Sequence, residues 1–227
     1  MCGRFALTET NPTVLAQVFD LDSVPSLSPR YNIAPTQAVA TVVRDPENGR
    51  SRLEVMRWGL IPSWAKDPAI GNKMINARGE TIAEKPAFRA ALRYRRCLVI
   101  ADGFYEWAAL DTGPKQPLFI TIKDRRPFGM AGLWERWTEP SSGEVLTTCT
   151  IITTEPNELM ATIHNRMPVI LPRDAYADWL DPKQTDGKQL LPLIQSYPAD
   201  RMTAWPVSRR VNSPQSDDPS LVERVGG

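Results

Sequence analysis

Histidine and cysteine are scarce in this chain. His164 is the one histidine among 227 residues, so a histidine-rich metal site is excluded and a catalytic histidine has a single candidate. The three cysteines are odd in number and far apart, which favours neither a disulfide framework nor a CxxC metal site. Cys97 and Cys149 stand in apolar or β-branched runs, and we expect both at buried strand positions. We expect no metal and no cofactor.

Long apolar runs are also missing. No run reaches the length of a membrane span, and the opening residues MCGRFALTE turn polar at once, unlike a signal peptide. We therefore expect a cytoplasmic protein with no membrane partner. The net charge is only +1, so any attraction for an anionic partner has to come from a local surface. The sequence contains no internal repeat, no phosphate-binding glycine loop and no zinc-spaced cluster.

The residues that are present predict an α+β fold. Runs rich in β-branched and aromatic residues are separated by short turns, which favours antiparallel pairing over βαβ units. We expect a single domain over residues 1–213, with an antiparallel, barrel-like β core and short flanking helices, and a flexible C-terminal tail over residues 214–227. The expected strands are 38–43, 53–58, 98–101, 104–108, 117–122, 128–134, 145–153 and 202–207, with a tight turn at 102–103; the expected helices are 12–19, capped by Asn11, 156–163, 174–180 and 187–194.

The second residue, Cys2, carries the most distinctive chemistry. If Met1 is removed, Cys2 has a free α-amine and a thiol on neighbouring carbons. The α-amine has a pKa of about 7.7–8.0, against about 10.4 for lysine, so a useful fraction is unprotonated near neutral pH. Such an amine attacks an aldehyde to give an imine, and the thiol can close on the imine carbon to form a thiazolidine ring. The alternative is that Cys2 is simply a small residue after the start codon.

Glu106 and His164 are the remaining candidates for proton transfer. Glu106 is flanked by aromatic residues in the run FYEW. It is either an exposed edge glutamate or, if partly buried, a carboxyl whose desolvation raises its pKa and prepares it for proton transfer. His164 follows an expected short helix, where a lone histidine is most often a cap or a satisfied polar contact.

Aromatic and basic residues suggest possible binding surfaces. We expect Trp58, at a strand end, to be a core anchor, whereas Trp64 is either a core anchor or a platform that stacks on flat rings. Asn76 and Arg78 stand two apart in an extended segment and so project to the same side. The basic segment 88–96 is either a solvated helix end with a positive last turn or a phosphate-contacting patch.

A series of motifs in order along the chain resembles the SRAP family, the SOS-response-associated peptidase proteins. The resemblance runs from Cys2 to about Asn212 and leaves the residues after Pro214 outside it. The motifs are Met1-Cys2-Gly3-Arg4-Phe5, Tyr31-Asn32-Ile33-Ala34-Pro35, Trp58-Gly59-Leu60-Ile61-Pro62, Asn76-Ala77-Arg78-Gly79-Glu80-Thr81, Ala101-Asp102-Gly103-Phe104-Tyr105-Glu106-Trp107 and His164-Asn165-Arg166-Met167-Pro168. The resemblance implies the SRAP fold and a role in the DNA damage response. We expect a monomer.

The resemblance implies a reaction with abasic sites in single-stranded DNA, whose opened sugar exposes an aldehyde. The implied product is a thiazolidine crosslink to Cys2, with weak strand cleavage (lyase) activity as a further possibility, and the protein would associate with the nucleoid when bound to DNA. Glu106 would open the sugar ring and move protons, Asn76 would hold the N-terminus and the sugar, and His164 would exchange a proton around the Schiff base.

Four further residues are implied as DNA contacts. Arg4 and Arg78 would grip phosphates beside the lesion, and Pro35 and Trp64 would lie against the flanking bases. We expect a local positive surface to line the same groove, which reconciles DNA binding with a near-neutral chain. Its expected members are Arg4, Lys66, Lys73, Arg78 and the segment 89–96.

Two other classes of function stay open at this point. Cys2, His164 and Glu106 also suit a cysteine-type peptidase that cuts its own Met1–Cys2 bond, or an N-terminal-nucleophile amidase. The third possibility is a DNA-binding module without catalysis. The product separates them, because a hydrolase forms a transient thioester, abasic-site capture leaves a lasting DNA adduct, and a plain binding module retains its function when Cys2 is replaced by alanine.

Overall fold

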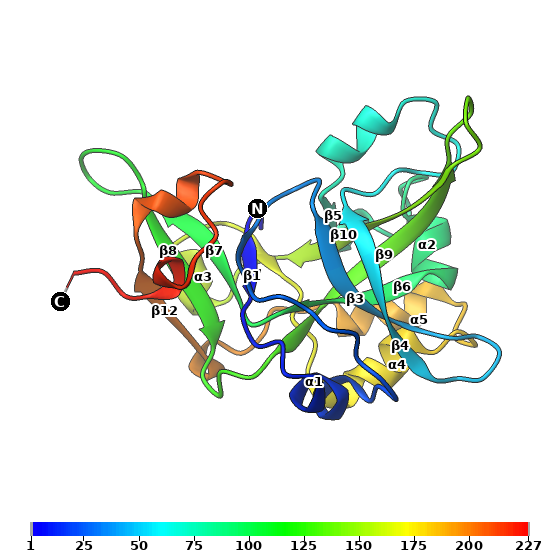
Figure 1. Cartoon of the computed structure of the whole chain (residues 1–227), viewed down its shortest axis with the longest axis horizontal. Coiled ribbons are helices and arrows are strands. Elements are labelled where there is room, and N and C mark those ends of the chain that lie inside the picture. The colour runs from blue at the N-terminus through cyan, green and yellow to red at the C-terminus, as the bar shows by residue number, and fades with distance from the viewer. Residues whose placement is uncertain (1, 227) are drawn as a thin grey trace.

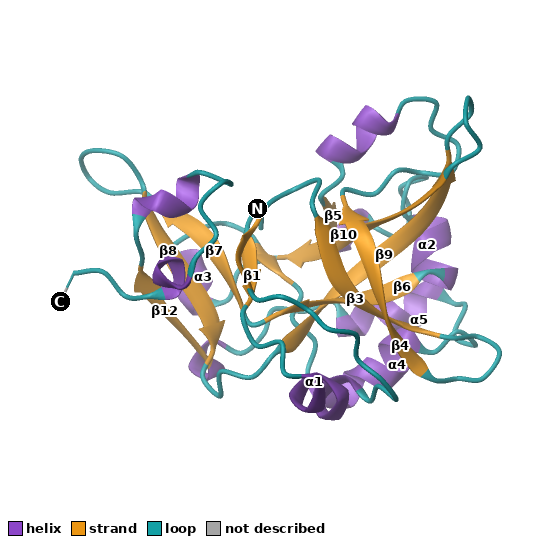
Figure 2. Ribbon diagram, in the orientation of Figure 1, coloured by secondary structure: helices purple, strands orange, loops and turns teal. Residues whose placement is uncertain are grey.

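The computed structural model describes residues 2–226, in which two β-sheets pack side by side (Figures 1 and 2). The five-stranded sheet has the order β12-β8-β7-β1-β2, and its neighbouring strands are all antiparallel. Its members are β1 (Phe5–Leu7), β2 (Arg30–Ile33), β7 (Gly103–Ala108), β8 (Gln116–Ile122) and β12 (Met202–Pro206).

The second sheet closes into a barrel. It has the order β11-β10-β4-β3-β6-β9, and β10 pairs with β9 as well as with β4, so five strands form a ring. The strands are β3 (Ala38–Arg44), β4 (Ser51–Trp58), β6 (Arg96–Ala101), β9 (Phe128–Thr138), β10 (Val145–Thr154) and β11 (Met167–Pro168), with β5 (Asn76–Arg78) beside β10. The expected barrel-like core is confirmed, but β10 runs parallel to β4 and β5. Long connections separate β10 from both strands, so no hairpin forces them to be antiparallel.

Short helices surround the sheets. The expected first helix is confirmed as α1 (Pro12–Phe19): the Asn11 side chain accepts a hydrogen bond from Thr13 N at 2.9 Å, and Leu15, Val18 and Phe19 are buried. The others are α2 (Arg89–Tyr94), α3 (Glu158–Ala161), α4 (Tyr176–Leu180) and α5 (Gly187–Leu190), with 3₁₀ turns η1 (Pro68–Lys73), η2 (Gly79–Thr81), η3 (Arg173–Ala175), η4 (Leu191–Leu193), η5 (Ala199–Arg201), η6 (Arg209–Asn212) and η7 (Pro219–Val222). Among residues 2–226, no helix is long and apolar enough to span a bilayer.

The core contains the residues that the sequence assigns to it. Cys97 on β6 and Cys149 on β10 are fully buried, which confirms them as strand positions in the core. Trp58 is also fully buried, and its indole N–H donates to the Ile75 carbonyl at 2.8 Å. Trp58 is therefore the expected core anchor, with its one polar atom satisfied.

The dipeptide Asp102–Gly103 connects the two sheets and does not form the expected turn. β6 pairs with β3 and β9 in the barrel, whereas β7 pairs with β1 and β8 in the other sheet. A Cβ atom on Gly103 would come within 2.0 Å of the Phe119 ring, so the crossing requires glycine.

The C-terminal segment is packed against the sheet, in contrast to the flexible tail expected over residues 214–227. Leu221 is fully buried, and Val225 N donates to the Pro206 carbonyl at 2.9 Å. The Asp217 carboxylate accepts hydrogen bonds from Asn32 N at 3.0 Å and from the Arg30 guanidinium. The polar side chain of Asp217 therefore forms hydrogen bonds with β2 and holds this segment against the sheet.

The basic segment ends in buried contacts, which corrects the expectation that all of it lines a DNA groove. Arg96 is 5% exposed, and its guanidinium donates to the carbonyls of Trp179 at 2.6 Å and of Leu92 and Arg93 at 2.7 Å. The bonds to Leu92 and Arg93 satisfy free carbonyls at the end of α2, and the bond to Trp179 satisfies one at the end of α4. Arg95 pairs with Glu135 at 2.8 Å.

Candidate functional site

Cys2 lies where the two sheets meet. Its side chain is completely buried, and the Asn76 side-chain amide donates to the Cys2 carbonyl at 2.8 Å. β5 is held on the barrel by parallel pairing of Asn76 with Ile151 of β10, while the N-terminal segment continues into β1 of the other sheet (Figure 1). Cys2 is thus positioned by β5 of the barrel and by its chain connection to β1 of the other sheet.

Glu106 approaches Cys2 through the pairing of β1 with β7. Phe5 pairs with Phe104, and Tyr105 N donates to the Arg4 carbonyl at 2.9 Å. Because the strands are antiparallel, the chain runs from Phe5 back to Cys2 as β7 runs from Phe104 on to Glu106. Glu106 is 3% exposed, so it is a buried carboxyl and not an exposed edge residue.

The Cys2 thiol is made less acidic by its surroundings. Burial raises the pKa of Cys2 far above its usual range, and the charge of Glu106 raises it further. The thiol is therefore neutral near neutral pH and needs a base when it reacts. A cysteine hydrolase requires the opposite arrangement, a thiol whose pKa is lowered so that the thiolate is available.

Asn76 and Arg78 stand on the same short strand and differ in exposure. Asn76 is half-buried, and within residues 2–226 its Oδ1 atom is buried and accepts no hydrogen bond. That oxygen can receive a hydrogen bond from an amine or a sugar hydroxyl. Arg78 is exposed and lines a cavity of about 600 Å³ together with Glu80, His164 and Arg166.

His164 is oriented by its own loop. The Arg166 backbone N–H donates to His164 Nδ1 at 3.1 Å, so a neutral ring carries its proton on Nε2. The Arg166 guanidinium holds both Glu80 carboxylate oxygens, at 2.6 and 2.9 Å, and also the Thr153 carbonyl at 2.7 Å. This ion pair was not expected from the sequence, although Glu80 and Arg166 carry opposite charges in two of the motifs.

Arg4 is tied to the C-terminal segment. Its Nη1 atom donates to Asn32 Oδ1 at 2.8 Å and to the Val211 carbonyl at 2.6 Å, and partial burial lowers the pKa of the guanidinium. The Asn32 amide in turn donates to the carbonyls of Ser213 at 2.9 Å and Ser216 at 2.7 Å. A phosphate contact by Arg4 stays a prediction, and this network fixes where its guanidinium stands.

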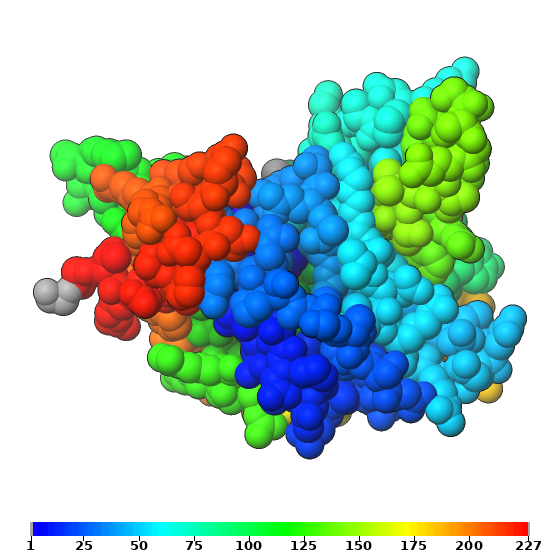
Figure 3. Space-filling view, viewed as in Figure 1, coloured from blue at the N-terminus to red at the C-terminus, as the bar shows by residue number. Residues whose placement is uncertain are grey.

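Pro35 and Trp64 lie on loops beside the barrel. Pro35 is half-buried, and Trp64 is 60% exposed, so its ring is available for stacking. The neighbouring Ala65 is buried, and its carbonyl accepts the Trp137 indole N–H at 2.7 Å, which holds the Trp64 loop in place. The space-filling view is hollowed between the orange C-terminal segment and the cyan region (Figure 3).

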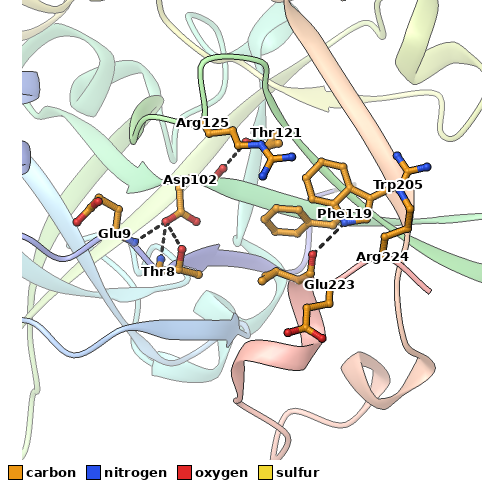
Figure 4. Close-up of a pocket in the computed structure, with 10 residues that line it drawn as sticks. Thr8, Glu9, Asp102, Phe119, Thr121, Arg125, Trp205, Glu223 and Arg224 are labelled. Atoms are coloured by element: carbon orange, nitrogen blue, oxygen red, sulfur yellow. Dashed lines mark hydrogen bonds between the residues drawn. The ribbon is translucent and has the colours of Figure 1, made fainter.

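The buried Asp102 carboxylate anchors the end of β1. Its Oδ2 atom accepts hydrogen bonds from Glu9 N at 2.7 Å, from Thr8 Oγ1 at 2.9 Å and from Thr8 N (Figure 4). The Asp102 backbone N–H donates to the Ala6 carbonyl at 3.0 Å. Asp102 therefore fixes the three-residue strand that leads back to Cys2.

We expect Asp102→Ala to lower the free energy of unfolding by about 2–4 kcal/mol, because hydrogen bonds to a charged acceptor are lost and buried donors stay unpaired. Urea denaturation measures this change.

Burial raises the pKa of Asp102, so the folded state binds this proton more tightly than the unfolded chain. The contribution of Asp102 to stability therefore falls as the pH rises from about 4 through its folded pKa, and the alanine variant lacks that dependence. Parallel pH profiles of parent and variant would contradict this account.

The comparisons with known proteins agree with this architecture. The family profile described as SOS response associated peptidase (SRAP) matches residues 1–214. The abasic site processing protein YoqW of Bacillus subtilis is 50% identical over 226 residues, covering 98% of this chain and 99% of that protein. The abasic site processing protein HMCES of Xenopus tropicalis is 35% identical over 220 residues, covering 87% of this chain and 65% of that protein. A crystal structure of a Bacteroides thetaiotaomicron protein aligns with a TM-score of 0.85 at 29% identity, over 99% of this chain and 100% of that one.

Proposed function

The chain belongs to the SOS response associated peptidase family, and from that premise we propose that it captures abasic sites in single-stranded DNA covalently through Cys2. The observation that carries the proposal is the position of Cys2, second in the chain and buried between Asn76 and the Glu106 carboxylate. The curated relatives named above are abasic site processing proteins, which supports DNA with an abasic site as the substrate. Met1, whose removal the reaction requires, lies outside the described residues.

The proposed reaction has two bond-forming stages. The Cys2 α-amine adds to the C1′ aldehyde of the ring-opened sugar, and the carbinolamine loses one water to give an imine. The thiol then adds across the C=N bond: sulfur bonds to C1′ and the thiol proton ends on nitrogen. The net change is the loss of one water. The raised thiol pKa supports this order, because a protonated thiol is a weaker nucleophile than a thiolate, so the α-amine adds first.

Glu106 is the proposed general acid and base. Its burial beside the thiol suits the carboxylate to take a proton from the attacking amine and pass it to the departing hydroxyl of the carbinolamine. It then takes the thiol proton and delivers it to the ring nitrogen. Asn76 has its amide on the Cys2 carbonyl and its Oδ1 atom ready to accept from the new α-amine. His164 is proposed to exchange a proton with the opened sugar, with its Nδ1 held by the Arg166 backbone.

The proposed DNA contacts are Arg4, Pro35, Trp64 and Arg78. Arg78 and Trp64 are exposed and suit a phosphate and a flanking base, respectively. Arg4 keeps the geometry of its guanidinium through Asn32 and Val211. Pro35 is half-buried and stands in the loop before β3, where its ring offers an apolar surface. These roles are separable from crosslinking chemistry, because they change binding and leave the reacting atoms in place.

The direct test is incubation with an oligonucleotide carrying one abasic site, followed by denaturing electrophoresis after heating. We expect a heat-stable protein–DNA band with the single strand. The same oligonucleotide with a tetrahydrofuran in place of the abasic sugar has no aldehyde and should give none. A band of equal strength with the tetrahydrofuran strand, or no band with either, would refute covalent capture through the aldehyde.

A further inference from the structure

A basic surface outside the Cys2 site lies beside α2 and α5. It borders a cavity of about 610 Å³ whose lining includes Arg89, Arg93, Tyr94 and Lys188, and we refer to these four residues as the α2–α5 surface. All four side chains are exposed, and Tyr94 is 53% exposed. None of them belongs to the proposed catalytic set.

The charges of the α2–α5 surface favour an anionic, ring-bearing partner. The Arg93 guanidinium lies 5.2 Å from the centre of the Tyr94 ring, and Arg93 Nε donates to the Thr185 carbonyl at 3.0 Å. Among the described residues that line this cavity, Asp186 carries the carboxylate, and that group accepts from Lys188 N at 3.0 Å as the cap of α5. The cavity is therefore lined by three cationic side chains, an exposed aromatic ring and one carboxylate, and that carboxylate is already hydrogen-bonded to the start of α5.

This surface is close to the Cys2 site along the chain. Asn76 contacts Cys2, and Ala83, only seven positions later, lines the α2–α5 cavity. Seven residues span at most about 25 Å. Arg78 and Arg166 line a further cavity, and Thr81, which lines it too, stands two residues before Ala83 in the chain. At about 3.4 Å per stacked nucleotide, about seven nucleotides cover the distance.

We propose that the α2–α5 surface binds the single strand that flanks the abasic site, with phosphates on Arg89, Arg93 and Lys188 and a base on Tyr94. The inference rests on the proposed function and extends it: the strand leaves Cys2 past Arg78 and continues over η2 to α2. Base stacking on an aromatic ring tolerates any sequence, and cations along the backbone give strong dependence on salt. Such a contact suits a protein that must capture lesions in any sequence.

The test compares the parent with Tyr94→Ala and with the double variant Arg89→Ala/Lys188→Ala. The probe is a fluorescent single strand with about ten nucleotides on each side of the central position, without an abasic site, so that anisotropy reports binding alone. We expect each variant to bind at least about fivefold more weakly. The double variant should lower the slope of log K against log salt by about 1.4, which corresponds to about two phosphates.

The matched control is Arg50→Ala/Arg52→Ala, which removes the same charge from the β3–β4 hairpin, where both arginines form exposed ion pairs that add little to stability. Equal binding by parent and both α2–α5 variants, or an equal loss in the control, overturns the proposal. Crosslinking of a short abasic strand, with about two nucleotides on each side, should be unchanged in all variants. Loss of that crosslink in the parent refutes the proposed function instead, so the two failures are distinguishable.

Discussion

Replacing Cys2 with alanine should abolish the heat-stable DNA adduct completely. Alanine keeps the α-amine and can form an imine, but it has no thiol to close the ring, and an imine hydrolyses when the sample is heated. Denaturing electrophoresis with an abasic single strand measures the loss. Non-covalent binding of an intact strand should be nearly unchanged, because Cys2 is fully buried and its contact with Asn76 uses the backbone carbonyl.

Two companion variants sharpen this result. Cys2→Ser keeps the amine and a hydroxyl, which is a poorer ring-closing nucleophile, so we expect an adduct that is less stable to heat. A protein that retains Met1 should form none, because its α-amine belongs to the wrong residue. Durable crosslinking by either one would mean that the ring does not form at Cys2.

Replacing Glu106 with glutamine should slow adduct formation by about 10²–10⁴-fold, the usual contribution of a positioned general acid or base. Glutamine has nearly the same shape, so the buried site can keep its packing, but it neither accepts the thiol proton nor protonates a leaving hydroxyl. Single-turnover rates with an abasic strand measure the effect.

The Glu106→Gln variant also carries an internal control. Removal of the nearby negative charge lowers the pKa of the Cys2 thiol relative to the parent, since that charge raises it. Under conditions in which the protein stays folded, the Cys2 thiol of the variant should therefore react faster with a small alkylating reagent, although crosslinking to DNA slows. If crosslinking and alkylation both accelerate, the Glu106 carboxylate acts only by raising the pKa of the Cys2 thiol, and it is not an acid or base in the reaction.

Local elements of the fold follow from the sequence because their causes are local. Asn11 and Pro12 define the start of α1, and the apolar spacing of Leu15, Val18 and Phe19 defines its buried face. The strands expected at 38–43 and 53–58 stand on either side of a turn, and their antiparallel pairing is confirmed in β3 and β4.

Non-local features could not be predicted in this way. The parallel pairing of β10 with β4 joins segments almost a hundred positions apart, so neither turn residues nor periodicity encodes it. The burial of Leu221 depends on a cluster with Tyr105 and Val211, and the surrounding polar residues conceal it. Arg96 looks like part of a basic surface until the carbonyls of Trp179 and Leu92 are seen around its guanidinium.

In the candidate site, too, some features could be predicted from the sequence and others depend on the fold. The position of Cys2 in the sequence is enough to suggest an amine–thiol nucleophile, and the motifs bring in Asn76, Glu106 and His164. The contact between Asn76 and Cys2 depends on β5 adding to the barrel, and the clamp of Arg166 on Glu80 joins two distant motifs. Only the folded chain reveals such contacts, because each depends on pairings between remote segments.

The most direct test of covalent capture is the intact mass of the protein before and after incubation with an abasic single strand. The account predicts a protein that lacks Met1 and then gains the mass of the oligonucleotide less one water, with the new bond mapped to Cys2. A processed protein that gains no DNA mass, or an adduct mapped to any other residue, would contradict it.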